Sequence, residues 1–217
     1  MSITNFMMAG GIVAWPLSAF SLLGVALIIE RISFWYRIKS RQHKVVTTVL
    51  KLYRSDQITG AMARLKQNAD LPVCRIFLEA LELDYATPTE FRLALETAAQ
   101  AELPLLRRFS TLFQTIITVS PLLGLLGTIL GLIRSFASLD IGNASGTNAT
   151  GVTGGISEAL TSTVMGLVVA IFTLLFANSF RSFYLSQLAL IQEYSGQLEL
   201  LYRRFYEKGE KTYAASR

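Results

Sequence analysis

Three long apolar stretches alternate with polar, charged segments along this chain. Two of them, from Phe109 to Ile133 and from Ala159 to Phe180, contain no Asp, Glu, Lys, Arg or His. A further apolar stretch runs from about Gly10 to Ile29 and is closed by Glu30 and Arg31. Each has about 20 residues, the length that a helix needs to cross the hydrocarbon core of a bilayer. The pattern predicts three transmembrane helices.

The second and third stretches each carry a stripe of small and hydroxylated residues. At 3.6 residues per turn, the members of a stripe fall within about 100° of one another on the helix surface. The stripes consist of Ser120, Gly124, Gly127, Thr128, Gly131 and Ser135 on the second stretch and of Thr163, Gly166, Ala170, Thr173 and Ala177 on the third. Small residues let helix backbones approach closely in lipid. We therefore expect helix packing at Gly124, Gly127, Gly131, Gly166 and Ala170.

Composition supports a membrane protein and excludes several other classes. A chain of 217 residues with 52% hydrophobic and only 16% charged residues is too apolar for a typical soluble domain. One Cys and one His exclude a disulfide framework and a Cys/His metal cluster, and His43 is expected to be a solvated surface residue. Because no phosphate-binding loop, dinucleotide fingerprint or nucleophile elbow is present, we expect no enzyme, no cofactor and no metal.

The distribution of Lys and Arg predicts the orientation in the membrane. Residues 31–108 contain thirteen of these residues and residues 181–217 contain six, whereas the hairpin 135–157 and the first eleven residues contain none. Basic residues that flank spans stay in the cytoplasm. We expect an external amino terminus, an external hairpin and a cytoplasmic carboxyl terminus. The net charge of +5 is then a topology signal, and no nucleic-acid partner is expected.

These features divide the chain into four parts. Residues 1–35 are the external amino terminus and the first transmembrane helix, and residues 36–108 are a cytoplasmic helical domain. Residues 109–180 are the second and third transmembrane helices with their external hairpin, which form the pore unit. Residues 181–217 are a carboxyl-terminal cytoplasmic helix.

The segments outside the apolar stretches also have helical patterns. Thr87 to Glu90 is a capping box with proline at the first helical position, a strong helix start. No glycine follows until Gly124, so one helix is expected from Pro88 through the second span, with kinks at Pro104 and Pro121. Upstream, residues 36–68 are compatible with a helix, and the segment Ala69 to Pro72 should end it.

A heptad-like seam follows the third span. Its members recur at alternating spacings of four and three residues: Tyr184, Leu188, Ile191, Ser195, Leu198, Tyr202 and Phe205. Such a seam needs a partner helix. The sequence leaves open whether that helix lies in the same chain or in a neighbouring copy.

Two threonines are predicted to lie at the same depth. Thr128 precedes Arg134, at the outer end of the second span, by six residues, and Thr163 follows Glu158, at the outer end of the third, by five. Both hydroxyls then lie about 8 to 9 Å inside the outer boundary. Such a pair can hold water or an ion, or each hydroxyl can bond to the carbonyl four residues earlier and serve only helix packing. The spacing favours neither interpretation.

Neither stripe has an ionisable residue at its centre. Glu158 is the one candidate; it lies at the outer mouth, about 140° around the helix from Thr163. Proton transfer across a membrane normally uses an ionisable group within it. If the chain forms part of a proton pathway, the titrating carboxylate comes from a second polypeptide.

The segments LLGLLGTILGLIRSF and GGISEALTSTVMGLVVAI resemble the signature of the ExbB/TolQ proton-channel family, which is related to MotA stators. The three-span layout is similar to that of ExbB and TolQ and differs from the four-span MotA branch. The resemblance implies a pentamer whose second and third spans line a pore around single-span helices of two ExbD- or TolR-like subunits, on which an aspartate carries the proton. It also implies that Thr128 and Thr163 are the pore threonines and Glu158 the pore glutamate. Phe172 departs from the family, because members often carry proline there.

We therefore expect an all-α integral membrane protein of the bacterial inner membrane, with a periplasmic amino terminus. It has three transmembrane helices, two of them extended into long cytoplasmic helices, and forms a pentameric ring surrounded by lipid. Its expected function is that of a proton-channel stator subunit that energises a TonB- or TolA-like protein for outer-membrane transport. A TolQ-type motor for envelope maintenance and a non-conducting membrane scaffold are the alternatives. The sequence leaves open whether the ion is H⁺ or Na⁺.

Overall fold

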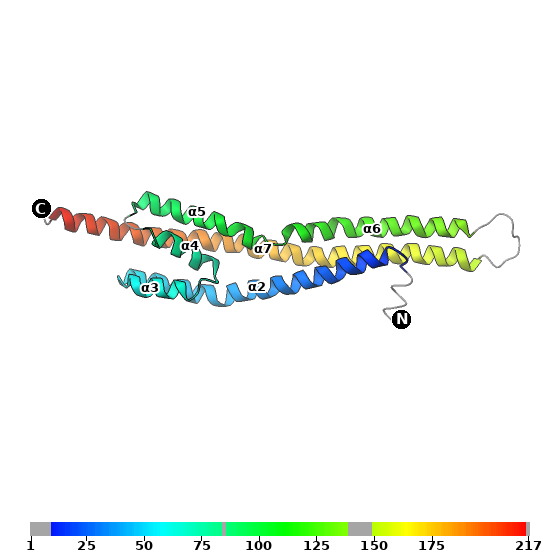
Figure 1. Ribbon diagram of the computed structural model, residues 1–217, viewed down its shortest axis with the longest axis horizontal. Coiled ribbons are helices and arrows are strands. Elements are labelled where there is room, and N and C mark those ends of the chain that lie inside the picture. Colours follow the sequence, from blue (N-terminus) through cyan, green and yellow to red (C-terminus); the bar gives the residue numbers. More distant parts are fainter. Residues whose placement is uncertain (1–9, 84–85, 139–148, 216–217) are drawn as a thin grey trace. The chain divides into compact units, whose positions relative to one another are not determined.

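The computed structural model describes residues 10–83, 86–138 and 149–215, and every regular element within these ranges is an α-helix (Figure 1). The helices are α2 (Ala14–Arg54), α3 (Ile58–Lys66), α4 (Pro72–Leu81), α5 (Pro88–Leu106), α6 (Ser110–Ala137) and α7 (Ala149–Ala215). Three helical segments are long and apolar enough to cross a membrane: Ala14–Arg54, Pro88–Ala137 and Gly151–Lys208. The expected all-α fold with three candidate spans is confirmed for the described residues. The first nine residues and the tip of the predicted hairpin, 139–148, lie outside them.

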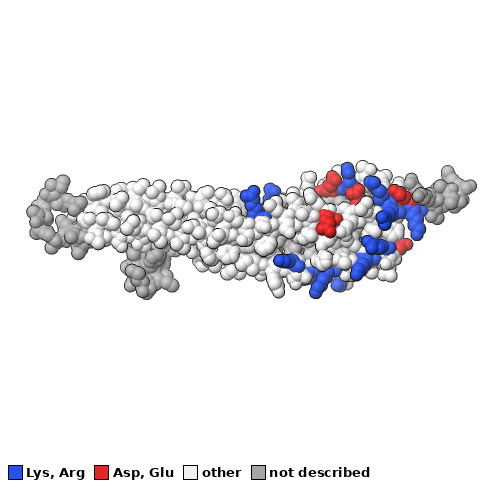
Figure 2. Space-filling view, turned by 180° about the vertical axis from the view of Figure 1, so that it is seen from behind, with Lys and Arg blue, Asp and Glu red and all other residues white. Residues whose placement is uncertain are grey.

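The chain divides into two compact units. Unit 1 consists of Met1–Arg31 and Phe109–Phe180, and unit 2 of Ile32–Arg108 and Arg181–Arg217. The apolar first part of α2, all of α6 and the first part of α7 belong to unit 1. Figure 2 shows a face of the molecule on which a large part of the surface carries no Lys, Arg, Asp or Glu.

Close contact between α6 and α7 in unit 1 depends on glycine. A Cβ atom added at Gly131 would lie 2.7 Å from the carbonyl oxygen of Gly155, and one added at Gly166 would lie 2.5 Å from that of Ser120. Gly124 similarly leaves room for the backbone of Thr163. On the outside of the same helices, large apolar side chains are exposed, among them Leu122, Leu125, Ile133, Leu160, Val168 and Leu175. Small residues therefore join the two helices, and the exposed surface suits lipid.

Unit 2 has a conventional apolar core. Its fully buried side chains come from α2, α3, α4, α5 and α7 and include Val46, Leu65, Ile76, Phe77, Phe91, Ile191 and Leu198. The guanidinium of Arg75 on α4 donates two hydrogen bonds to the carboxylate of Glu102 on α5, at 2.6 and 2.5 Å. This bidentate pair fixes the two helices against each other.

The expectation of one continuous helix from Pro88 through the second span is wrong. Helix α5 ends at Leu106, and α6 begins at Ser110 after Phe109, whose φ of 67° is left-handed. Pro104 and Pro121 both lie inside helices. The guanidinium of Arg31 lies 5.8 Å from the centroid of the Phe109 ring, a contact within unit 1 between residues far apart in the sequence.

A second break was also not expected. Helix α2 ends at Arg54 and α3 begins at Ile58, with Asp56 between them at a φ of 62°. Asp tolerates this left-handed conformation better than most residues. The break expected between Ala69 and Pro72 is confirmed, as is the capping box, in which the Thr87 hydroxyl accepts from the Glu90 N–H.

The heptad-like seam of α7 packs within the chain. The ring of Tyr202 stacks on that of Phe91, with centroids 3.9 Å apart, and its hydroxyl donates to the carbonyl of Ala86 at 2.6 Å. The ring of Tyr184 lies under the guanidinium of Arg107. Between α2 and α7, two buried glutamines exchange hydrogen bonds, and exposed His43 contacts the Tyr194 hydroxyl through Nδ1 at 2.9 Å. The seam therefore finds its partner helices in the same chain.

Helix α7 continues without a break past Phe172, the position at which the family often has proline. The ring of Phe172 is half exposed and lies 5.0 Å from that of Phe176, centroid to centroid. No kink is therefore assigned to this position.

Candidate functional site

The hydroxyls of Thr128 on α6 and Thr163 on α7 are hydrogen-bonded to each other. The two residues expected at one depth thus lie face to face in unit 1. Both side chains are partly exposed, so the pair lies at the edge of the α6–α7 seam.

Two backbone carbonyls, those of Gly124 and Ala159, surround this pair of hydroxyls. Thr128 Oγ1 lies 3.2 Å from the carbonyl oxygen of Gly124 and 3.3 Å from that of Ala159, and Thr163 Oγ1 lies 3.1 Å from that of Gly124. Each hydroxyl has one proton to donate, so these acceptors compete for two protons. The cluster therefore has spare acceptor capacity for a further donor such as water.

The geometry bears on both interpretations of the threonines. Thr128 bonds to the carbonyl four residues earlier, as the packing interpretation requires. Thr163 instead bonds across the seam to Gly124, and each hydroxyl contacts the other. Local backbone bonding therefore accounts for only part of the arrangement.

Ser162 and Ser120 extend the polar lining, and the role of the first was not expected from the sequence. The buried hydroxyl of Ser162 donates to the carbonyl of Ala159 at 2.9 Å, and a Cβ atom at Gly127 would lie 2.3 Å from it. Ser162 lies at the edge of the predicted stripe, next to Thr163. The spacing of the stripe residues therefore did not single it out. The buried hydroxyl of Ser120 has no hydrogen-bond partner among the described residues.

Glu158 lies apart from the threonines and forms an ion pair with Arg134. The side chains of the two residues are 20% and 47% exposed. In the sequence, Arg134 only marks the outer end of the second span. The signal that could have found the pair is the presence of opposite charges at matching ends of two antiparallel helices.

Unit 1 has few charged side chains, and they are paired. Within its described residues the ionisable side chains are Glu30, Arg31, Arg134 and Glu158. Arg31 Nε lies 3.9 Å from Glu30 Oε2, near the start of α6, and the other pair lies near the end of α6. Between these two ends the described part of unit 1 carries no charge.

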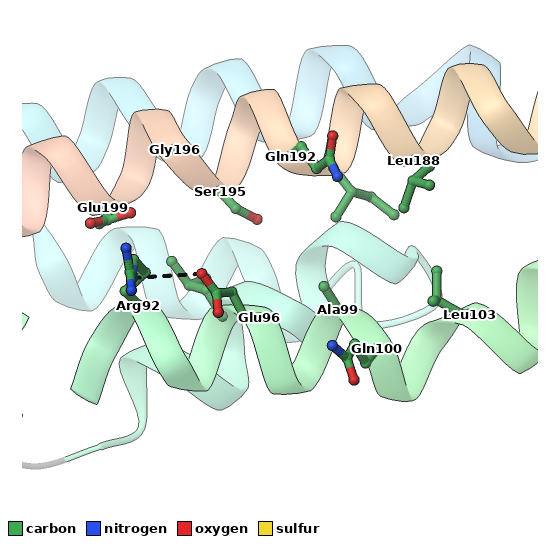
Figure 3. Close-up of a pocket in the computed structure, with 12 residues that line it drawn as sticks. Arg92, Glu96, Ala99, Gln100, Leu103, Leu188, Gln192, Ser195, Gly196 and Glu199 are labelled. Carbon is green, nitrogen blue, oxygen red and sulfur yellow. Dashed lines mark ion pairs between the residues drawn. The ribbon is translucent and has the colours of Figure 1, made fainter. Parts of the chain in front are cut away.

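Unit 2 contains a groove outside the threonine cluster (Figure 3). It encloses about 540 Å³ between α5 and α7, and its lining residues include apolar Leu95 and Ile191 and charged Arg92, Glu96 and Glu199. Arg92 pairs with Glu96 on its own helix. The mixed charges and the apolar lining favour no particular small molecule. The described residues also contain no cluster of three or more His, Cys, Asp or Glu that could hold a metal ion.

Comparison with known families gives a match that covers residues 68–193, more than half of the chain, to the MotA/TolQ/ExbB proton channel family. The chain belongs to this family. The matched region includes α6, the threonine pair, the ion pair at Glu158 and the part of α7 that enters unit 2. Membership identifies a channel or transport subunit and agrees with the three membrane-spanning candidates.

Named relatives place the chain among ExbB homologues. A Synechocystis sp. protein named ExbB-like 3 is 72% identical over 211 residues, which are 97% of this chain and 100% of the relative. A second protein of that organism, named ExbB-like 1, is 38% identical over 91% of this chain and 78% of its own length. The biopolymer transport protein ExbB of Salmonella typhimurium is 35% identical over 54% of this chain and 46% of its own length.

Proposed function

We propose that this chain is a proton-channel stator subunit of a motor in the bacterial inner membrane. With an ExbD- or TolR-like single-span partner it uses the proton motive force to energise a TonB- or TolA-like protein. The observation that carries this proposal is the Thr128–Thr163 hydroxyl pair in an apolar unit whose charged side chains lie at its two ends. Family membership and the ExbB names of the relatives support it.

The mechanism uses the threonine pair as a polar contact for a carboxylate on the partner. A charge in a low-dielectric pore costs several kcal/mol unless it is paired, and protonation of the partner's aspartate removes that cost. The partner helix then shifts or rotates past the wall, and the hydroxyls and the spare carbonyl acceptors at Gly124 and Ala159 provide its hydrogen-bonding side. The membrane potential supplies about 2.3 kcal/mol per charge per 100 mV.

The assembly proposed around this site is a homopentamer. Helix α6 and the first part of α7 line its pore, and the partner helices occupy the centre. The charge distribution supports a periplasmic amino terminus and a cytoplasmic unit 2, since Lys and Arg gather in segments 31–108 and 181–217. The relatives' names favour an ExbB role in transport over a TolQ role in envelope maintenance.

The test is removal of the two hydroxyls. Thr128→Val and Thr163→Val keep the branched side-chain shape, so the complex should assemble at normal abundance. Each change should reduce transport driven by the reconstituted motor by about tenfold, because a buried polar partner loses a hydrogen bond worth about 1–3 kcal/mol. Thr128→Ser and Thr163→Ser should each reduce transport less than the corresponding valine substitution does.

Thr161 is a matched control for these substitutions. It lies on the same helix, and its hydroxyl donates to the carbonyl of Ser157, four residues earlier, at 2.7 Å. Thr161→Val should therefore leave transport within about twofold of the parent, since a local helix bond contributes little.

A non-conducting scaffold is the second candidate. It is favoured by the bonds from Thr128 and Thr163 to the Gly124 carbonyl, which satisfy both hydroxyls inside the chain. Unchanged transport in the Thr128→Val, Thr163→Val double mutant at normal complex abundance would establish the scaffold and overturn the channel.

A further inference from the structure

The carboxylate of Glu158 lies where three segments of unit 1 meet. Its Oε1 atom is paired with Nη1 of Arg134, in the last turn of α6. The same atom lies against the backbone of Gly11, in the turn before α2, because a Cβ atom at Gly11 would be only 1.6 Å from it. The end of α6 therefore supplies the guanidinium of Arg134, and the turn before α2 supplies the backbone of Gly11, which has no side chain.

Glycine is required at position 11 for two independent reasons. Its φ of 62° lies in the left-handed region, which L side chains rarely adopt. A Cβ atom there would also lie 2.6 Å from the carboxyl carbon of Glu158, so the carboxylate would have to move. The preceding Gly10 packs the turn onto α7, since a Cβ atom there would lie 3.0 Å from Sδ of Met165.

The position of this carboxylate differs from that of the threonine cluster. Five residues along α7 separate Glu158 from Thr163, which is about 8 Å along the helix and about 140° around it. The ion pair with Arg134 is therefore displaced toward the end of the seam. Of the ionisable side chains in the described part of unit 1, Arg134 is the one paired with Glu158, and the turn at 10–13 brings none.

We propose that Arg134 and Gly11 are positioning residues that fix the Glu158 carboxylate at the outer end of α6 and α7. Held there, the carboxylate meets protons arriving from outside before they reach the Thr128–Thr163 pair, and it stays out of that cluster. This role rests on the proposed channel function. It assigns to the first span, through Gly11, a part in shaping the proton entrance.

The contact itself is tested by stability, independently of transport. The thermal midpoint of the purified chain in detergent is measured for Arg134→Gln, Glu158→Gln and the double mutant. We expect the two single changes to lower the midpoint by amounts whose sum exceeds the effect of the double mutant, because each single change breaks the same pair. Arg92→Gln is the matched control, since Arg92 pairs with Glu96 on an exposed helix surface.

The positioning role is tested by proton flux. The complex is purified from its native membranes through a tag on this chain, reconstituted in liposomes, and assayed with a pH-sensitive dye in the lumen. Arg134→Gln should lower the flux by about tenfold, as misplacement of a functional group does, and Arg134→Lys should restore most of it. The swapped pair Arg134→Glu with Glu158→Arg should restore the thermal midpoint but not the flux, because the carboxylate is then on α6.

Gly11→Ala tests the contact between Gly11 and the Glu158 carboxylate. It should lower both stability and flux, whereas Gly154→Ala, at a helical position with open space around it, should leave the flux unchanged and should not lower stability. In a Glu158→Ala background the clash with the carboxylate is absent, so the loss of stability from Gly11→Ala should shrink to the backbone strain alone.

Different results would overturn the positioning role and the channel function. Additive effects of Arg134→Gln and Glu158→Gln on the thermal midpoint, or parent-like flux in Arg134→Gln, would overturn the positioning role alone. Absence of proton flux in the parent complex would overturn the channel function and the positioning role with it, even if the stability coupling remained.

Discussion

At the residue scale, this chain combines positions that periodicity reveals with positions that it does not. The threonine pair follows from residue spacing, because Thr128 and Thr163 lie six and five residues from the matching ends of antiparallel spans. The contact of Arg134 and Gly11 with Glu158 does not follow from it. That contact depends on the rotational phase of three segments, and a single sequence does not specify how helices are rotated against one another.

Cys74 provides a residue-scale prediction with a pH dependence. Burial, and secondarily the nearby Asp70, raises the pKa of its thiol to about 12. We expect no alkylation of the folded chain at pH 8 and rapid alkylation after denaturation, since the thiolate is the reactive form. Mass measurement after a short exposure to a maleimide, with and without denaturant, checks this.

The raised pKa of the Cys74 thiol also makes the stability of the fold depend on pH. Because the pKa in the folded state lies above the ordinary value of 9.0, the protonated thiol favours folding below pH 9, and this contribution is lost as the pH rises from about 9 to 12. Cys74→Ala should remove this alkaline contribution. Equal pH dependence of unfolding in Cys74→Ala and the parent would contradict the assignment.

At the element scale, the sequence predicted which segments are helical but not every place where a helix is interrupted. The start of α5 was correct because Thr87, Pro88 and Glu90 form a local cap. The breaks at Phe109 and Asp56 were missed because neither position has glycine or proline, the residues that usually mark a left-handed turn. The ring of Phe109 lies near the guanidinium of Arg31, which is distant in sequence.

Gly131 tests the close approach of α6 and α7. Gly131→Ala places a Cβ atom 2.7 Å from the Gly155 carbonyl oxygen and 2.8 Å from the Ala159 nitrogen, so the two backbones must separate. We expect a loss of about 1–3 kcal/mol in the free energy of unfolding, as overpacking usually costs. Denaturation of the purified chain in mild detergent measures it.

Gly196 supplies the control for this substitution. It lies inside α7 with nothing within 4 Å of its Cβ position, so Gly196→Ala should raise stability by about 0.5–1 kcal/mol through helix propensity. A loss at Gly131 no larger than the change at Gly196 would contradict a tight seam.

At the scale of the whole molecule, charge divides the chain more sharply than any motif does. Unit 1 has four ionisable side chains in its described part, whereas the thirteen Lys and Arg of residues 31–108 lie, apart from Arg31, in unit 2. The three spans and the membrane class were therefore predictable from composition. The division of α2 and α7 between two units was not, because both helices pass from one unit to the other without a break.

The proposed orientation is tested by cysteine labelling at two exposed positions. Gly154→Cys, near the start of α7, should react with a membrane-impermeant maleimide added to spheroplasts, and Ser186→Cys in unit 2 should react only after the membrane is opened. The buried Cys74 should not react with the maleimide under either condition, so no cysteine-free background is required. The reverse labelling pattern would contradict the orientation and with it the proposed direction of proton entry.

The pairing of charges in unit 1 has an electrical consequence. Glu30 with Arg31 and Arg134 with Glu158 give zero net charge at each end of the described part of this unit. A neutral body that moves in an electric field has no net work done on it, whereas each unpaired charge that crosses gains about 2.3 kcal/mol per 100 mV. In the proposed channel, the membrane voltage therefore does no net work on unit 1 of this chain. It acts on the charge of the partner that moves past α6 and α7.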